Sequence, residues 1–333
     1  METRTLGDTG LVVTPLGIGL AAIGRPGYIT LGRDRDLGAA RTPDDLRARC
    51  FAMLDAARAA GVRYVDAARS YGRAEEFLGA WLRARGVAPG ALTVGSKWGY
   101  RYTAGWTIDA VVHEEKELSL ARFRAQLAES RTHLGAWLDL YEIHSATLES
   151  GVLDDQALRE ALCDARAAGV YRAVGLTLSG PTSAATLARA LAAGAGGRRV
   201  FDVVQATFNL LEPSLAPQLA AAHAAGLGVI VKEVHANGRL TATNARPADA
   251  ALVARLATVA AAATMGVDQL AIAWALRHPF VDVVLSGAAT PEQLASHRDA
   301  VERPLDAATA DDLRAAAEPP ERYWKTRASL PWS

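Results

Sequence analysis

Three segments of the chain share one pattern: an amphipathic stretch with helical spacing, a glycine, and a short apolar run. They are ARAAGVRYVDAA (58–69), ARAAGVYRAVGL (165–176) and AHAAGLGVIVKE (222–233). Gly61, Gly169 and Gly226 stand where a helix end needs left-handed dihedral angles, and the run that follows each glycine is typical of a buried strand. The pattern therefore predicts helix-to-strand joints of a parallel sheet.

Extending this pattern along the chain predicts eight strands separated by helices. The strands are expected at 16–19, 64–66, 92–97, 138–144, 171–176, 203–206, 228–232 and 283–286. Helices are expected at 74–84, 119–134, 154–168, 215–225, 252–265 and 267–277, after a first helix with Thr42 as its N-cap and Pro43 at its first position. Eight successive strand–helix units favour an α/β fold of the (β/α)₈ TIM-barrel type over an open doubly wound sheet.

The length of 333 residues fits one such barrel with extra loops, and no composition shift or linker divides the chain. We therefore expect one domain over 1–333, with a C-terminal tail from about residue 305. Apolar residues alternate around Gly7 and Asp8, which predicts a short N-terminal β-hairpin at the bottom of the barrel.

Charge and composition exclude several classes of function. The 36 basic and 36 acidic side chains balance, and they form no basic block for a nucleic acid. No window is apolar enough for a membrane helix and the first residues do not resemble a secretion signal, so a soluble, cytoplasmic protein with small-molecule partners is expected. Cys50 and Cys163 lie in amphipathic helical patterns, as buried core cysteines do, and the oligomeric state is left open.

Polar residues stand at the C-terminal ends of the predicted strands, where barrel enzymes carry their active sites. Asp66 ends the second strand and Tyr71 follows in the loop, Lys97 ends the third strand, and His144 ends the fourth. A single buried Asp or His at such a position is commonly structural. Four of them together predict an active site.

The four side chains suit proton transfer to a carbonyl oxygen. A phenol is a poor acid at neutral pH unless a cation stabilises its phenolate, and we expect Lys97 to lower the pKa of Tyr71 in this way. Asp66 can keep Lys97 charged, and His144 can hydrogen-bond and orient the substrate oxygen. Carbonyl reduction also needs a hydride, which no side chain supplies and which implies a cofactor.

At these positions the chain resembles the aldo-keto reductase superfamily, through VDAARSYG, VGSKWG and LYEIHS in that order and through motifs along nearly the whole chain. The resemblance implies an NAD(P)(H)-dependent oxidoreductase that reduces an aldehyde or ketone, or oxidises the corresponding alcohol or sugar. It also implies that the catalytic tetrad is Asp66, Tyr71, Lys97 and His144, with Tyr71 as the general acid or base.

The resemblance assigns a cofactor site as well. Gln205 would bind the nicotinamide carboxamide, Phe208 would stack on the ring, and Thr177 stands in a Ser-Asn pair whose second member is here Leu178. Lys232 and Arg239 could carry phosphate charge, although Arg239 could equally be a solvated loop residue. The remaining cofactor contacts are expected at Gly19, Asn237, Gly238, Gly287, Gln293 and His297.

The preference between the two nicotinamide cofactors is open. The family implies NADP(H), but the stretch expected around the 2′-phosphate contains Ala288, Ala289, Thr290 and Gln293 and no cation, so NAD(H) is an alternative. The connection after the third strand is rich in aromatic residues, and Trp98, Tyr100 and Trp106 are expected to line a substrate pocket or else to pack the loop on the barrel. The other histidines lack metal-ligand spacing, and no metal is expected.

Two other functions remain as alternatives. A non-redox member of the same fold could be a cyclase, a dehydratase or a cofactor-sensing subunit. A Schiff-base aldolase could use Lys97 or Lys232, although Asp66 beside Lys97 would keep that lysine protonated and non-nucleophilic. Substrate identity and reaction direction depend on loop conformations that the sequence leaves open.

Overall fold

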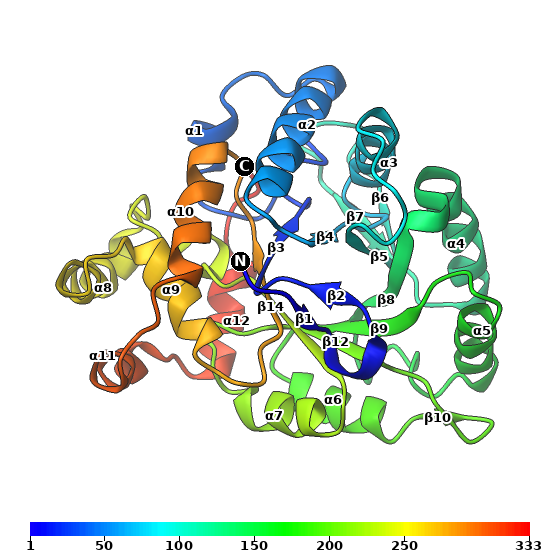
Figure 1. Cartoon of the computed structure of the whole chain (residues 1–333). Helices are drawn as coiled ribbons and strands as arrows, with labels where there is room; N and C mark the ends of the chain where they lie inside the picture. The colour runs from blue at the N-terminus through cyan, green and yellow to red at the C-terminus, as the bar shows by residue number, and fades with distance from the viewer.

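The computed structural model describes all 333 residues, and its centre is a closed barrel of eight parallel strands (Figure 1). Val284 of the last strand lies opposite Leu16 of the first, and this pairing closes the barrel. The predicted (β/α)₈ barrel is confirmed. Its strands, in chain order, are β3 (Leu16–Gly19), β4 (Tyr64–Asp66), β5 (Thr93–Trp98), β8 (Leu138–Ala146), β9 (Ala173–Leu178), β12 (Val203–Thr207), β13 (Gly228–Lys232) and β14 (Val283–Ser286).

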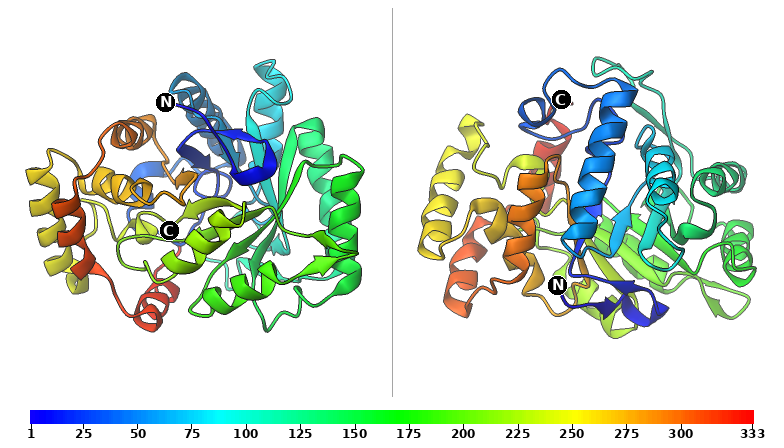
Figure 2. Two further views of the ribbon diagram at one scale, coloured as in Figure 1. Left: turned by 60° about the horizontal axis from the view of Figure 1, so that its bottom comes forward. Right: turned by 45° about the horizontal axis from the view of Figure 1, so that its top comes forward.

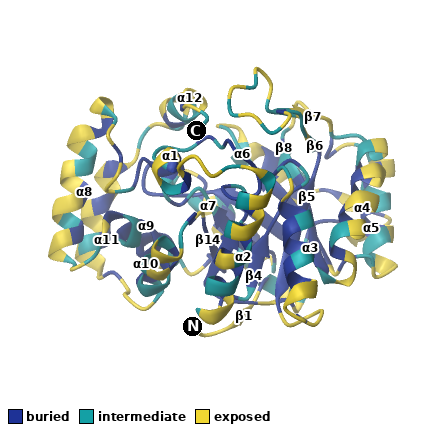
Figure 3. Ribbon diagram, turned by 90° about the horizontal axis from the view of Figure 1, so that it is seen from above, coloured by how far each residue is buried: buried dark blue, intermediate teal, exposed yellow.

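Helices surround the barrel, with their exposed faces outward and the buried strands inside (Figure 3). The helices that follow barrel strands are α2 (Pro43–Ala59), α3 (Ala74–Ala84), α4 (Leu120–Leu134), α5 (Gln156–Ala167), α6 (Ser183–Leu191), α7 (Ala216–Ala224), α9 (Val267–Leu276) and α10 (Pro291–Val301). Four more lie in the loops and the C-terminal segment: α1 (Arg33–Leu37), α8 (Ala250–Ala262), α11 (Ala307–Leu313) and α12 (Pro320–Ala328).

Local sequence signals set the ends of these helices. The Thr42 side chain accepts a hydrogen bond from the Asp45 backbone N–H at 3.2 Å, and the Asp45 carboxylate accepts one from the Thr42 N–H at 3.0 Å. This reciprocal capping box fixes the start of α2, as its sequence predicts. Gly61, which follows the same helix, has a φ of +80°, the left-handed conformation expected of it.

The predicted N-terminal hairpin is present as β1 (Arg4–Thr5) paired antiparallel with β2 (Val12–Val13). It closes the N-terminal end of the barrel, where Leu6, Leu11 and Val13 join the apolar side chains of the barrel interior. The turn passes so close to β13 that a side chain at Gly7 would overlap the backbone of Gly228. Figure 2 shows this dark blue hairpin at the end of the barrel opposite the C-terminal residues.

Three segments far apart in sequence meet over the other end of the barrel. Tyr28, in the loop after β3, exchanges backbone hydrogen bonds of 3.1 and 3.0 Å with Ser333. Leu31 donates its N–H to the Asn237 carbonyl at 2.9 Å. The antiparallel pair β6 (Tyr100–Tyr102) and β7 (Glu114–Lys116), in the connection after β5, also lies at this end.

Two smaller features complete the description. A second antiparallel pair, β10 (Gly194–Ala195) with β11 (Arg198–Arg199), follows α6. No single helix has the length and apolar character of a membrane span, although the bent helix pair Pro247–Ala262 and Val267–Leu276 together reaches those limits.

The interior of the barrel changes from apolar to polar along its axis. Leu140, Val203 and Ile230 fill the end beside the hairpin. Two residues further along two of these strands, the inward positions are Glu142 and Gln205, both buried. Because side chains of a strand alternate between its two faces, this polar layer follows directly from the position of the apolar one. The site lies in the polar half, at the C-terminal strand ends.

Candidate active site

The structure brings the four predicted catalytic residues together at the C-terminal ends of β4, β5 and β8. Lys97 Nζ lies 2.5 Å from Asp66 Oδ2 and 3.4 Å from Tyr71 Oη. The rings of Tyr71 and His144 meet edge to face, with centroids 5.6 Å apart. Asp66, Tyr71, Lys97 and His144 therefore form one continuous cluster.

Lys97 and Asp66 form an ion pair inside the barrel, with side chains 0% and 3% exposed. Two further groups form hydrogen bonds with this ion pair. Lys97 Nζ also donates to the Ala67 carbonyl at 3.0 Å, and the Tyr64 hydroxyl donates to Asp66 Oδ1 at 3.3 Å. A buried pair is stable only when such additional hydrogen bonds replace the lost water. Lys97 is thus held as a fixed cation beside the Tyr71 hydroxyl.

The pKa of Tyr71 shifts in the direction opposite to the one expected from its sequence. Burial raises the pKa of the phenol well above its usual value, and the Asp66 carboxylate raises it further. The Arg25 guanidinium acts against this rise. In this structure desolvation outweighs the effect of Arg25, and Tyr71 is a fully protonated phenol at neutral pH.

His144 is held as a neutral imidazole. Burial lowers its pKa well below the usual value, and the nearby Lys97, Lys232 and Arg25 lower it further. Its Nδ1 lies 3.4 Å from Ser70 Oγ. A neutral ring beside Tyr71 can hydrogen-bond an oxygen without competing as an acid.

Two charged residues of this cluster were not among the sequence predictions. Arg25, 2% exposed, lies against the Tyr71 ring, donates to the Ser70 carbonyl at 2.9 Å and pairs with Glu114. It sits in a loop and offers no sequence signal. Glu142, 0% exposed, lies directly beside Lys97 in the barrel sheet, and a glutamate inside the apolar run LYEIHS is a signal that could have identified it.

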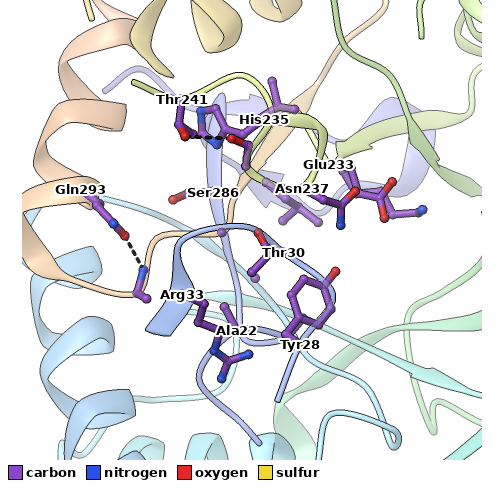
Figure 4. Close-up of a pocket in the computed structure, with 18 of the residues that line it drawn as sticks. Ala22, Tyr28, Thr30, Arg33, Glu233, His235, Asn237, Thr241, Ser286 and Gln293 are labelled. Carbon is purple, nitrogen blue, oxygen red and sulfur yellow. Dashed lines mark hydrogen bonds between the residues drawn. The ribbon is translucent and has the colours of Figure 1, made fainter. Parts of the chain in front are cut away.

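A cavity of about 330 Å³ opens beside the cluster, and Asp66 and Tyr71 line it. Figure 4 shows Gln293 of α10 and Asn237 among the other lining residues. Gly287 faces open space, because a Cβ there would meet nothing within 4 Å. Gln293 lines the cavity with its amide oxygen bound to the Ala289 N–H at 2.9 Å. Eight of the predicted cofactor residues line it: Gly19, Gln205, Lys232, Asn237, Gly238, Gly287, Gln293 and His297.

The wall formed by β13 carries a linked set of charges. Lys232 Nζ donates to Ser179 Oγ at 3.0 Å and to Thr207 Oγ1 at 2.9 Å, and burial lowers its pKa to about 8. Glu233 next to it binds Arg327 of α12 at 2.6 Å. The C-terminal segment is thereby tied to the cavity wall.

Three predicted cofactor residues lie away from the cavity. Phe208 is fully buried against Trp274 of α9, with ring centroids 5.0 Å apart, and is not placed to stack on a ring in the cavity. Thr177 is fully buried and accepts a hydrogen bond from the Ser145 N–H at 2.7 Å. Arg239 is 2% exposed, because Asp249 and Glu318 bind its guanidinium.

The predicted substrate-pocket aromatics are also outside the lining of the cavity. Trp98 is fully buried and packs on Phe123 of α4 at 5.3 Å, because it alternates with the inward-pointing Lys97. Trp106 donates its indole N–H to the Arg41 carbonyl at 2.8 Å and so packs the loop. Only the Tyr100 ring lies near the cluster, with its centroid 4.9 Å from that of His144.

Comparison with known proteins identifies the family. The sequence profile described as the aldo/keto reductase family matches residues 26–318, most of the chain. The protein belongs to the aldo/keto reductase family. It is accordingly an oxidoreductase of this superfamily, as its motifs predict.

Solved structures of this fold agree with the barrel. The aldo-keto reductase AKR11C1 from Bacillus halodurans, in its holo form, is similar with a TM-score of 0.72 at 21% identity, over 96% of this chain and 97% of that one. A protein from Pseudomonas aeruginosa assigned to the aldo-keto reductases has a TM-score of 0.61 at 23% identity, over 90% and 95% of the two chains. Among curated proteins no sequence matches.

Within the aldo/keto reductase barrel, no group of three or more His, Cys, Asp or Glu side chains is arranged to hold a metal ion. The His235 and His297 rings lie 4.6 Å apart, and His297 Nε2 of α10 lies 3.8 Å from Asp268 of α9. Burial lowers the pKa of both imidazoles. His297 is held by Ser286, whose Oγ lies 2.8 Å from Nδ1.

Proposed function

We propose that this protein reduces an aldehyde or ketone, or oxidises the corresponding alcohol or sugar, with NADPH or NADH as the hydride carrier and Tyr71 as the proton-transferring group. The observation that carries the proposal is the contact of Lys97 with both Asp66 and Tyr71 at the wall of the cavity. These three groups supply a proton at one fixed atom, Tyr71 Oη, and their surroundings exclude bulk water.

The residues around the cavity suit a nicotinamide dinucleotide. Gln205 uses its amide nitrogen to bind Asp66 and Glu142, so its carbonyl oxygen remains for a donor such as a carboxamide N–H. Ala289 and Gln293 place the N-terminus of α10 at the cavity, where helix N–H groups favour phosphate. The bound cofactor supplies a hydride when reduced and accepts one when oxidised.

The residues of the chain divide the remaining work. In reduction, the Tyr71 hydroxyl donates its proton to the substrate oxygen as negative charge develops there, and the Lys97 ammonium stabilises the phenolate that is left. A Ser70 hydroxyl that donates to His144 Nδ1 leaves Nε2 protonated, so the imidazole can donate a second hydrogen bond to the same oxygen. Oxidation reverses these steps, with Tyr71 as the base.

The choice between NADPH and NADH is open in this proposal. The family resemblance favours NADPH, whereas the stretch after β14 carries no cation and Arg239 is already bound by two carboxylates. Lys232 is a cation of the cavity wall, with a lowered pKa. Separate titrations with NADPH and NADH, followed by protein fluorescence, measure the preference directly.

The test combines a substrate screen with a Tyr71→Phe variant. Aldehydes, ketones and sugars are screened while the absorbance of the reduced nicotinamide is followed. Tyr71→Phe should lower turnover by about a hundredfold or more and leave cofactor affinity nearly unchanged. Tyr141→Phe is the matched control, since this buried tyrosine contacts Ser130 outside the barrel. Equal turnover in Tyr71→Phe would refute the assigned role.

One observation favours a second activity, a Schiff-base aldolase that uses Lys232. This lysine lines the cavity, and its pKa of about 8 leaves a fraction of the amine neutral and nucleophilic near neutral pH. Reduction with borohydride in the presence of an aldehyde or ketone would then attach the substrate to Lys232. Absence of the adduct, together with tight binding of NADPH or NADH, supports the reductase.

A further inference from the structure

Glu142 lies in the polar layer of the barrel, directly beside the Lys97–Asp66 pair. It is the pairing partner of Lys97 between β8 and β5, and its side chain is 0% exposed. Room for it comes from Gly175 in β9, where an added Cβ would lie 2.8 Å from Glu142 Cγ. A buried carboxyl group therefore occupies a space that a glycine on the next strand leaves open.

Glu142 has few hydrogen-bond donors for a buried carboxyl group. Gln205 Nε2 donates to Glu142 Oε2 at 3.1 Å and to Asp66 Oδ1 at 3.0 Å, so one amide bridges two carboxyl groups. The second oxygen of Glu142, Oε1, has no hydrogen-bond partner and is buried. An ionised carboxylate with a single donor and an unpaired oxygen in the interior carries a large desolvation cost.

The cations that face Glu142 are too few to keep both Glu142 and Asp66 ionised. Lys97 from β5 is the cation that lowers the pKa of Glu142 most, and it contacts Asp66 from β4 at 2.5 Å. Lys232 from β13 has a smaller effect, and its ammonium donates to Ser179 and Thr207. Asp66 accepts from Lys97, Gln205 and Tyr64, and Glu142 accepts from Gln205 alone. The ionised member is therefore Asp66, and Glu142 retains a proton.

We propose that Glu142 is a positioning residue that holds a second proton in the active site: as a neutral acid it orients Gln205 and allows Lys97 to act on Asp66 and Tyr71 alone. When it loses this proton, a second negative charge enters the cluster and makes the Tyr71 phenolate harder to form. The protonation state follows from the geometry by itself, and the effect on catalysis rests on the proposed role of Tyr71.

The directions of the pKa shifts in the cluster agree with this proposal. Burial raises the pKa of Glu142 to about 8; Lys97 acts against the rise, and Asp66 adds to it. Charge on Glu142 in turn raises the pKa of Tyr71. The proton is thus lost only above neutral pH, and its loss opposes deprotonation of Tyr71.

The first experiment measures the proton without substrate or cofactor. Infrared difference spectra of the protein between pH 6 and pH 10, roughly two units to each side of the pKa of Glu142, should show loss of the carbonyl band of a protonated carboxylic acid. This band should be absent from Glu142→Gln and unchanged in Glu75→Gln. Glu75 is the matched control, because this equally buried glutamate is paired with Arg69. A spectrum of Glu142→Gln identical to that of the unmodified protein would overturn the proposal.

The second experiment measures the coupling to Tyr71. In Glu142→Gln no charge can form at this position, so the alkaline limb of the pH profile for alcohol oxidation should move to lower pH, by roughly one unit. The thermal midpoint confirms that the variant is folded. An unchanged limb in a folded Glu142→Gln would contradict the coupling. Complete absence of hydride transfer in the unmodified protein would instead refute the proposed function, and the infrared result would still stand.

Discussion

The guanidinium of Arg25 lies over the ring of Tyr71, with Cζ 5.4 Å from the ring centroid. The same guanidinium also lies over Tyr28 at 5.4 Å and over Trp332 at 5.1 Å, so one buried cation joins the loop after β3 to the C-terminal residues. Of the charges that act on Tyr71, Arg25 is the main one that lowers its pKa. The cation expected to lower the pKa of Tyr71 was Lys97, and the structure adds Arg25 as a second cation beside this ring.

Replacing Arg25 should therefore weaken Tyr71 as a base. In Arg25→Gln the pKa of Tyr71 rises further, and alcohol oxidation at neutral pH should fall about tenfold for each unit of that rise. The pH dependence of oxidation measures the shift. Glu114→Gln is the control, and it should lower the pKa of Tyr71, because the Glu114 carboxylate raises that pKa. Shifts of the same sign in the two folded variants would contradict this role.

The Glu233–Arg327 ion pair holds α12 against the cavity wall, and its contribution to stability should be lost at low pH. Arg327 and Lys232 hold the pKa of Glu233 at about 2, below its usual value, so its contribution to stability is complete above the unfolded pKa and is lost as pH falls from about 4.5 toward 2. Glu233→Gln should lower the free energy of unfolding near neutral pH by about 3 kcal/mol.

Urea unfolding at several pH values measures this difference. The gap between Glu233→Gln and the unmodified protein should narrow on acidification, since protonation removes the same charge from the native residue. A gap that stays constant from neutral pH down to pH 2, the folded pKa, would show that the ion pair contributes nothing.

Gly95 should tolerate no side chain. It lies in β5 opposite Asp66 of β4, and a Cβ there would overlap the Tyr64 hydroxyl, which binds Asp66. Gly95→Ala should lower the free energy of unfolding by about 1–3 kcal/mol, as overpacking does in a closed interior. Gly194→Ala is the control, because the nearest atom to its Cβ would be the Arg198 carbonyl oxygen at 3.7 Å. Equal thermal midpoints for the two variants would disagree with this account.

Arg239 should prove structural. Its guanidinium binds Asp249 at 2.9 Å and Glu318 at 2.7 Å, with its side chain 3% exposed. Arg239→Met leaves two carboxylates near each other without their cation and should cost about 3–5 kcal/mol of unfolding free energy. At a temperature where the variant is folded, its affinity for NADPH should be nearly unchanged. A selective loss of NADPH affinity over NADH affinity with an unchanged thermal midpoint would instead support a phosphate-binding role.

Much of the architecture is already present in the local sequence pattern. The helix–glycine–strand joints at Gly61, Gly169 and Gly226 predict a parallel barrel, because each glycine permits a backbone conformation that ends a helix before a buried strand. The alternation of side chains along a strand could also have predicted the positions of two residues correctly. Once Lys97 and Gln205 point inward, Trp98 and Phe208 lie on outward positions and pack on helices.

By itself the sequence determined the barrel, the N-terminal hairpin and the proximity of Asp66, Tyr71, Lys97 and His144, because strand order and strand ends follow from local periodicity. Tertiary structure alone decided which charges face one another. Arg25 reaches Tyr71 from a loop, Arg327 reaches Glu233 from α12, and Glu142 is left beside Lys97 without a second donor. Such contacts join residues 46 to 94 positions apart or lie across neighbouring strands, and pKa shifts depend on burial and distance, which no local pattern encodes.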